Sequence, residues 1–273
     1  MPLCGYDIMR QALWKLLHSS HSIAIGYKEV IAVIKTIKLC NVSFFFLISA
    51  TVVIAFVFVM FTKNSDISLV SASGKTDKPV LVIDAGHGGA DGGAVSLSGV
   101  LESELNLDIA LRMAALSDLT GIEYTMTRES NDISYPESAK SISNKKKYDQ
   151  KQRVKMISDT SNAVLISVHQ NCYPHKSPFG PQSFYSKIVG SDSLAELIQN
   201  SMNTVLCPGN RRIAMPVAKD IFLFKSVNCP AVLVECGFVS NPSESKLLDT
   251  ETYRLKIAAV LTCAYLQYLD SNE

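Results

Sequence analysis

The sequence has almost no net charge. Its 26 lysines and arginines nearly balance its 25 aspartates and glutamates, which leaves a formal net charge of +1 over 273 residues. No basic stripe stands out along the chain either. A protein that holds nucleic acid through its phosphates needs such a stripe or a strong positive field. The composition therefore predicts no nucleic-acid partner.

The chain also lacks paired cysteines and internal repeats. Its seven cysteines are an odd number, and none forms a CxxC pair. This excludes a zinc knuckle or a disulfide framework and predicts free, mostly buried thiols. Cys172 and Cys236 lie near a histidine and a glutamate in the sequence, but no cysteine–base pair with a third orienting group is evident. A cysteine hydrolase is therefore disfavoured.

One long hydrophobic run is present near the start. Residues 42–61 form a run of 20 residues without a charge, which is long enough for a helix to cross the hydrocarbon core of a bilayer. We therefore expect a transmembrane helix over residues 42–62. Basic residues lie mainly before it, which predicts a cytoplasmic segment 1–41 and an exported remainder. The expected location is the cell membrane, with a single span and an extracytoplasmic catalytic domain.

A cleaved signal peptide is the alternative reading of this run, and it would make the protein secreted. Small residues at 70–72 resemble a cleavage site, but they lie about ten residues beyond the apolar segment, and the leading region is unusually long. An uncleaved anchor is therefore favoured. Residues 63–78 are polar, small and non-periodic, which is typical of a linker. The catalytic domain is expected over residues 79–270.

From residue 79 the chain alternates short apolar runs with helical periods. Strands are expected at residues 79–84, 122–127, 163–169 and 231–235, and helices at 101–119, around 154–157, at 193–205 and at 253–269. This alternation predicts a single α/β domain whose mostly parallel sheet is flanked by helices on both faces. The fold class is therefore α/β, with the transmembrane helix preceding the domain.

Three ionisable residues follow apolar runs: His87, His169 and Glu235. The carboxyl ends of strands in an open α/β sheet converge on one crevice, so these side chains should meet. Two neutral imidazoles and one carboxylate are a usual protein ligand set for catalytic zinc. Spacing alone does not choose the carboxylate, which could be Asp84, Glu102 or Glu104.

Other charged residues have plainer interpretations. Arg128 and Arg153 are expected to brace the loops around the crevice rather than to contact substrate. The lysine run 145–147 could meet anionic wall polymers, but a charge run is usually a solvated face. His175 lies in a loop flanked by prolines and is expected to be exposed.

Six segments carry a resemblance to a known family. They read VIDAGHGG at 82–89, DGGA at 91–94, GVLE at 99–102 with Asn106 and Leu107, TR at 127–128, LISVHQN at 165–171 and PAVLVECGFVSN at 230–241. In this order the chain resembles the zinc-dependent N-acetylmuramoyl-L-alanine amidases of type 3. The resemblance extends from about residue 80 to about residue 268.

The resemblance implies a role for each matched residue. His87, Glu102 and His169 would hold one zinc ion, Glu235 would be the catalytic carboxylate, and Glu104 would fall outside the motif. The implied reaction is hydrolysis of the peptidoglycan amide bond between N-acetylmuramic acid and L-alanine, by zinc-activated water with a glutamate base. Gln170 stands where alanine is common in the family, without a role in the metal chemistry.

A narrower resemblance and two alternatives complete the analysis. The anchor, the minimal domain and the stretch 180–185 are similar to sporulation amidases that prepare the spore cortex for germination. The alternatives are a zinc peptidase acting within the stem peptide and a non-catalytic wall-binding or regulatory module. No long acidic helix that could plug the site is evident after His169, so control is expected from expression, location or an unknown regulatory protein.

Overall fold

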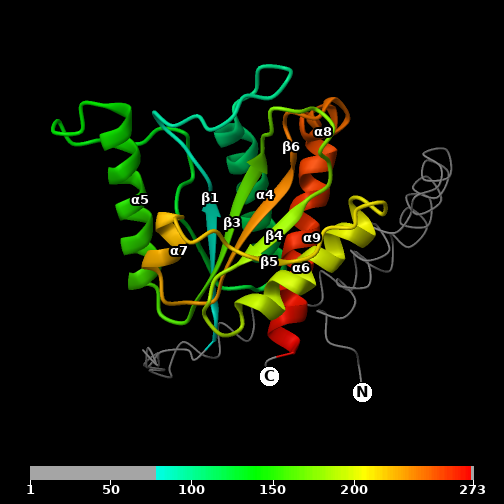
Figure 1. Ribbon diagram of the computed structural model, residues 1–273. Helices are drawn as coiled ribbons and strands as arrows, with labels where there is room; N and C mark the ends of the chain where they lie inside the picture. The colour runs from blue at the N-terminus through cyan, green and yellow to red at the C-terminus, as the bar shows by residue number, and fades with distance from the viewer. Residues whose placement is uncertain (1–77, 272–273) are drawn as a thin grey trace, which may run out of the picture. The chain divides into compact units, whose positions relative to one another are not determined.

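Six strands form one sheet in the computed structural model, which describes residues 78–271 (Figure 1). Their order across the sheet is β2-β1-β3-β6-β4-β5. The strands are β1 (Val80–Ala85), β2 (Tyr124–Met126), β3 (Ala163–Asn171), β4 (Gln182–Tyr185), β5 (Met215–Pro216) and β6 (Ala231–Phe238). The four neighbours β2, β1, β3 and β6 are parallel, whereas β4 runs antiparallel to β6 and parallel to β5. The predicted α/β fold with a mostly parallel sheet is confirmed, since only the pairing of β4 with β6 is antiparallel.

The two strands beyond β6, which are β4 and the edge strand β5, were not expected from the sequence. β4 has four residues and β5 has two, so neither gives an apolar run long enough to stand out. The opposite edge, β2, spans only three of the six residues predicted for it. Short edge strands limit the row of unpaired backbone groups that another chain could join.

Six helices accompany the sheet in the described part of the chain. They are α4 (Glu102–Thr120), α5 (Ile142–Asp159), α6 (Ser191–Val205), α7 (Phe222–Ser226), α8 (Pro242–Leu248) and α9 (Glu251–Asp270). Gly121 ends α4 in the left-handed conformation, with φ of 70°. The hydroxyl groups of Ser141 and Thr250 accept from backbone N–H groups at the starts of α5 and α9. The short helices α7 and α8 were not predicted.

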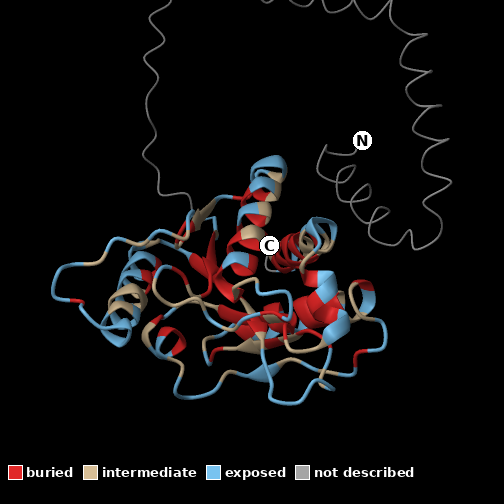
Figure 2. Ribbon diagram, turned by 90° about the horizontal axis from the view of Figure 1, so that it is seen from above, coloured by how far each residue is buried: buried red, intermediate tan, exposed pale blue. Residues whose placement is uncertain are grey.

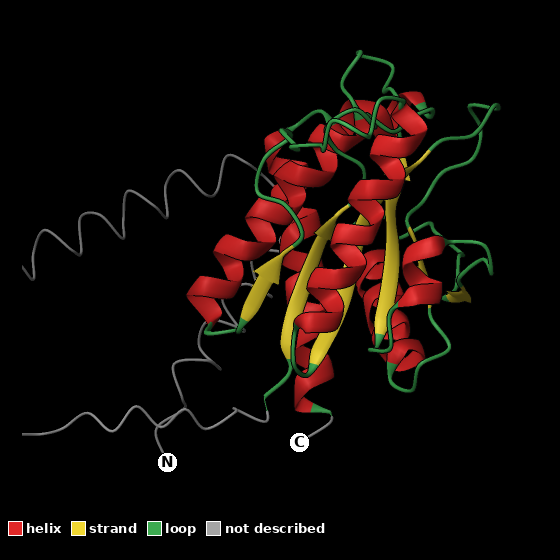
Figure 3. Cartoon of the chain, turned by 90° about the vertical axis from the view of Figure 1, so that its left-hand side faces the viewer, coloured by secondary structure: helices red, strands yellow, loops and turns green. Residues whose placement is uncertain are grey.

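Helices cover both faces of the sheet, as expected. On one face α4, α6 and α9 pack against alternate strand residues such as Leu81, Ile166 and Val232. On the other face the intervening residues, such as Leu165 and Leu233, contact side chains of α5 and α7. Figure 3 shows the strands between these helical layers, and Figure 2 shows that buried residues gather in the strands and on the helix sides facing them.

The predicted amino-terminal features lie outside the described residues. This applies to the segment 1–41, the transmembrane helix 42–62 and all of the linker 63–78 except its last residue. Within residues 78–271, no helix combines the length and the hydropathy needed to span a bilayer. The transmembrane anchor therefore stays a prediction from the sequence.

Candidate metal centre

Polar side chains replace apolar ones at the carboxyl ends of the central strands. Side chains alternate between the two faces of a strand, so residues two apart share a face. On β3, the face that begins with Leu165 continues with Ser167 and His169. On β6, the face that begins with Leu233 continues with Glu235. The side of the sheet covered by α5 and α7 therefore changes from core to candidate site along each strand.

Strand register places His169 and Glu235 next to each other. The two residues are Cα partners in the parallel ladder between β3 and β6. Directly after this pair the register shifts, between His169 and Asn171. Although 66 positions separate the two residues in the sequence, the predicted convergence at the sheet edge is confirmed.

His87 lies two residues beyond β1 in a turn that two arginines hold. Arg128 donates to the carbonyl oxygens of Ala85 at 2.9 Å and of Gly86 at 3.0 Å. Arg153 donates to Ala85 O at 2.7 Å and also to the carbonyl of His87. Both arginine side chains are buried, which confirms the bracing role expected for them.

Glu102, the first residue of α4, turns its carboxylate into the protein. Its Oε1 lies 3.1 Å from His169 Nδ1 and 3.3 Å from His87 Nε2. The backbone N–H groups of Gln170 and Ala94 donate to its two oxygens at 3.1 and 2.9 Å. Only 5% of the side chain is exposed, so these contacts fix the carboxylate where it faces both histidines.

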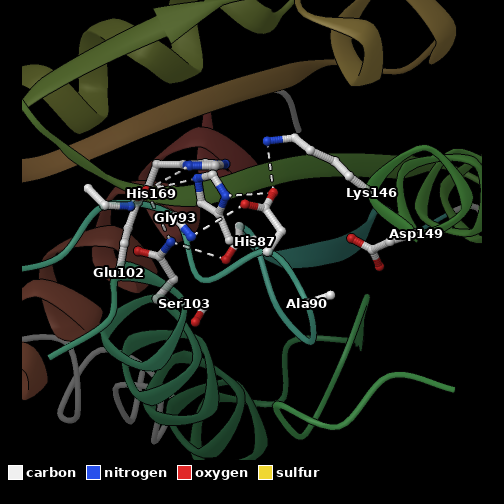
Figure 4. A network of polar contacts seen from close by, with 12 residues as sticks. His87, Ala90, Gly93, Glu102, Ser103, Lys146, Asp149 and His169 are labelled. Carbon is white, nitrogen blue, oxygen red and sulfur yellow. Dashed lines mark hydrogen bonds and ion pairs between the residues drawn. The ribbon is translucent and has the colours of Figure 1, made fainter. Parts of the chain in front are cut away.

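The three residues form a compact donor cluster (Figure 4). One potential ligand atom from each of His87, Glu102 and His169 lies within 4.8 Å of the others. The two imidazole rings meet edge to face, with centroids 4.9 Å apart. Among residues 78–271 this is the set of three or more such side chains close enough to hold a metal ion.

The electrostatics of the cluster favour a cation. Burial disfavours the charged form of His87, but hydrogen bonds to Asp91 and Glu102 outweigh it and raise the pKa of His87 to about 9. Burial likewise opposes ionisation of Glu102, yet its contacts with both histidines hold the pKa of Glu102 well below its usual range. Two imidazoles and one ionised carboxylate are a common donor set for zinc, so the residues present fit that ion.

Glu235 stands beside the cluster without being part of it. Its Oε2 is buried and has no hydrogen-bond partner among the described residues. Burial raises the pKa of Glu235 to about 7, against the opposing influence of the nearby His169. A carboxylate with a free oxygen and a pKa near neutrality is suited to accept and return a proton.

The structure also decides between the carboxylates that the sequence left open. Asp84 is buried, and its oxygens accept hydrogen bonds from Ser167, Thr127 and Arg153. It therefore holds neighbouring strand ends in place rather than joining the histidines. Glu104 is exposed on the outer side of α4. Glu102 alone of the three joins the histidines.

Neither cysteine near the site forms a nucleophilic pair. Cys172 is exposed, whereas Cys236 is buried, and burial raises the pKa of the Cys236 thiol. A thiol in such surroundings stays protonated and inert. His175 is exposed, as expected.

Three residues that sequence reasoning did not assign support the cluster. Asn106 donates to Gly86 O at 3.1 Å and accepts from the side chain of Gln170 at 3.1 Å. Asp91 Oδ2 lies 3.0 Å from His87 Nδ1. Asn106 and Asp91 stand in the family-like segments, one helical turn after Glu102 and four residues after His87, and those spacings are the signal that could have found them.

A cavity of about 280 Å³ opens beside the cluster. The two histidines and Glu235 line one side of it. Lys146 and Gln150 from α5, together with Phe224 from α7, line another. The two histidines of the cluster and Glu235 therefore face a space that a substrate could enter.

Gly86 is required by the close approach of His169. A Cβ at Gly86 would fall well inside van der Waals contact of three atoms of the His169 imidazole. We expect Gly86→Ala to displace this ring and to lower hydrolytic activity about 100-fold, since misplacing a catalytic group by about 1 Å has effects of that order. The measurement is turnover of the purified protein beside its zinc content. Gly209→Ala is the control, because no atom lies within 4 Å of a Cβ there, and an equal loss in both variants would contradict the prediction.

The fold and the cluster together define a class. An α/β sheet whose strands present two histidines, a glutamate and a separate, partly buried glutamate at their carboxyl ends has the arrangement of a metal-dependent hydrolase. Comparison with known proteins then gives the family. Residues 81–264 match the N-acetylmuramoyl-L-alanine amidase family, and the chain belongs to it.

Individual relatives agree with this assignment. The germination-specific N-acetylmuramoyl-L-alanine amidase of Bacillus subtilis (strain 168) is 36% identical over 190 residues, which cover 69% of this chain and 79% of the relative. The structure of the CwlD amidase from Clostridioides difficile, solved in complex with the GerS lipoprotein, has a TM-score of 0.68 at 35% identity. The match covers 71% of this chain and 100% of that one.

A third comparison concerns a more distant member. The catalytic domain of CwlV, an N-acetylmuramoyl-L-alanine amidase from Bacillus (Paenibacillus) polymyxa var. colistinus, has a TM-score of 0.58 at 26% identity. The match covers 71% of this chain and 99% of that domain. The resemblance to type 3 amidases, including the germination subgroup, is confirmed by these matches.

Proposed function

We propose that this amidase cleaves the bond between N-acetylmuramic acid and L-alanine in peptidoglycan, using one zinc ion held by His87, Glu102 and His169, with Glu235 as general base. The observation that carries the proposal is the register pair His169 and Glu235. It sets a candidate metal ligand beside a buried carboxylate that has an unpartnered oxygen. A wall-binding module without activity would have no need for such a carboxylate.

Each residue has a distinct task in this proposal. Bound zinc supplies Lewis acidity, which polarises the amide carbonyl and makes water acidic near neutral pH. The Glu235 carboxylate, which lines the cavity, accepts the proton of the attacking water and then gives it to the departing amide nitrogen. Asp84, Arg128 and Arg153 hold the strand ends and the His87 turn so that this geometry is fixed before substrate arrives.

Product analysis tests the reaction. We expect digestion of peptidoglycan by the purified full chain to release free stem peptides that begin with L-alanine, together with peptide-free glycan. Mass spectrometry of the soluble products distinguishes this outcome from its alternative, because a peptidase would release shortened stems and leave the muramic acid amide intact. Assays without added protein also show whether an activator is essential, since strong activity alone would exclude one.

We further propose that residues 42–62 anchor the chain in the cell membrane, with the catalytic domain on the wall side. The uncharged run and the basic residues before it support this placement. The CwlD neighbour was solved together with a lipoprotein, which supports the idea that a membrane-associated partner regulates this chain. Such a partner would reach a domain that is tethered to the same surface.

A further inference from the structure

The carboxylate of Asp91 makes contact with His87 on the side opposite Glu102. Its backbone is fixed by a two-way bridge to Gly88, in which Gly88 N donates to Asp91 O at 2.8 Å and Asp91 N donates to Gly88 O at 3.0 Å. From this position Asp91 Oδ2 lies 3.0 Å from His87 Nδ1. The side chain of Asp91 is only 20% exposed, so the contact is sheltered from water.

This contact decides which nitrogen of His87 carries the proton. An ionised carboxylate can only accept hydrogen bonds, so His87 Nδ1 must be the donor. His87 Nε2 also faces an ionised carboxylate, so both ring nitrogens can donate while no metal is bound. A metal ion would replace the proton at Nε2, because Nδ1 keeps its hydrogen bond to Asp91 and only Nε2 can then offer a lone pair. His87 Nε2 is the atom that faces Glu102, at 3.3 Å. Aspartate side chains are ionised at neutral pH, and Asp91 faces two donors, His87 Nδ1 and Lys146 Nζ.

The backbone of His87 gives Asp91 a second task. His87 has φ of 59°, in the left-handed region that residues with a Cβ adopt rarely. An exposed residue in that conformation would be free to rotate its ring away from the cluster. Asp91 on one side and Glu102 on the other leave the ring one orientation.

Lys146 ties this arrangement to helix α5. Its Nζ lies 2.8 Å from the same Asp91 Oδ2, and Figure 4 shows its side chain reaching from α5 toward the His87 side of the cluster. The two neighbouring lysines make no such contact with the cluster. Lys145 Nζ lies over the ring of Tyr135, 5.2 Å from its centroid, and Lys147 is exposed. One member of the lysine run therefore has a specific contact.

We propose that Asp91, held in place by Lys146, is a positioning residue that fixes the tautomer and ring orientation of His87 for zinc. The inference deepens the proposed function and rests on its assignment of His87 as a ligand. Asp91 acts only through His87 and is not a catalytic residue. A carboxylate behind a ligating histidine also raises the basicity of that ligand.

The test is the zinc affinity of the full chain, measured by competition with a chromophoric chelator. Loss of an outer-shell partner typically costs 10- to 100-fold in metal affinity, so we expect Asp91→Asn to bind zinc about 10- to 100-fold more weakly. The visible spectrum of the Co²⁺-substituted variant should shift as well, because the orientation of one ligand changes. The metal-free variant should still unfold in one cooperative thermal transition, which shows that the loss of affinity is not a loss of the fold. Asp159→Asn is the control, since Asp159 pairs with Lys155 at the surface, away from the cavity.

Lys146→Gln provides a second and milder test. Its side chain is 45% exposed, so the variant should fold even where Asp91→Asn does not. We expect zinc affinity to fall about threefold to tenfold in Lys146→Gln, at the lower end of outer-shell effects, and to stay unchanged in Lys147→Gln. Loss of a nearby positive charge would by itself strengthen the binding of a cation. Unchanged or tighter zinc binding in Lys146→Gln, or equal weakening in the two lysine variants, would therefore overturn the role of Lys146.

The outcomes separate this inference from the proposed function. Wild-type protein that binds zinc tightly, together with an Asp91→Asn variant of equal affinity and unchanged Co²⁺ spectrum, would overturn the positioning role alone. Wild-type protein that binds no zinc would overturn the metal centre itself, and the positioning role with it. Weaker binding in Asp91→Asn and Lys146→Gln, with unchanged controls, supports both.

Discussion

Glu235→Gln is expected to abolish most hydrolysis while leaving zinc binding intact. The amide keeps the shape of the side chain but cannot accept the proton of the attacking water, and loss of a general base typically costs about 10²- to 10⁴-fold in rate. Glu235 is absent from the three-residue donor cluster, so the metal content should not change. The measurement is the rate of peptide release from peptidoglycan beside zinc analysis of the same sample. Full activity in the variant would refute the assignment of the base.

The same variant should have a characteristic effect on stability. Burial raises the pKa of Glu235 to about 7 from its ordinary value of 4.5. Between these values the unfolded state releases the proton first, so the wild-type free energy of unfolding falls as pH rises from 4.5 and is lowest above 7. A difference of that size corresponds to about 3 kcal/mol. Metal-free Glu235→Gln should therefore be more stable than wild type at pH 8 by up to that amount, and equal to it below pH 4.5.

Urea unfolding at several pH values measures this difference. Glu104→Gln is the matched control. It makes the same chemical change at an exposed glutamate that takes no part in the cluster. Its activity and stability should follow wild type throughout. A stability difference between Glu235→Gln and wild type that does not change with pH would show that Glu235 titrates normally in the folded protein.

The central strands were predictable because the length of each apolar run indicates a buried strand and the polar residue at its end marks where the strand reaches the crevice. β1, β3 and β6 are apolar runs long enough to be recognised, and their polar ends mark the crevice. Periodicity is silent, however, about elements as short as α7 or β5, whose positions come from packing against the rest of the fold. The antiparallel β4 was also hidden, because strand direction depends on the path of the chain rather than on local pattern.

The candidate site shows the same division. His87, His169 and Glu235 were found from their places at or just beyond the carboxyl ends of apolar runs, and the structure brings them together at the carboxyl end of the sheet. Glu102 and Glu104 could not be separated by helix position alone, since both lie in the first turn of α4. Glu102 differs from Glu104 because its side chain contacts His169 and Gln170 of β3. This difference depends on how α4 packs against the sheet, which the local sequence does not show. The contact between Asp91 and Lys146 joins a loop to a distant helix, and no local pattern announces it.

Of the variants proposed here, Arg153→Met is expected to lower the free energy of unfolding most. The guanidinium of Arg153 lies 2.8 Å from Asp84 and 2.9 Å from Asp149, and its side chain is only 6% exposed. Asp84 is 1% exposed. Removing one partner of a buried pair leaves an uncompensated charge, so the free energy of unfolding should fall by about 3–5 kcal/mol. The turn that carries His87 would loosen too, because Arg153 donates to the carbonyls of Ala85 and His87.

Denaturant unfolding of a double-mutant cycle checks the cause. Burial opposes ionisation of Asp84, but Arg153 and the hydroxyls of Ser167 and Thr127 hold the pKa of Asp84 below its usual range. If the lost pairing is the cause, adding Asp84→Asn to Arg153→Met should cost less than the sum of the single changes. Lys155→Met breaks the exposed ion pair between Lys155 and Asp159, which lie four residues apart on the same helix. Its free energy of unfolding should stay within about 1 kcal/mol of that of the wild type. Strict additivity in the cycle would instead assign the loss to the contacts of Arg153 with the backbone, and so to the loop rather than to the buried charge.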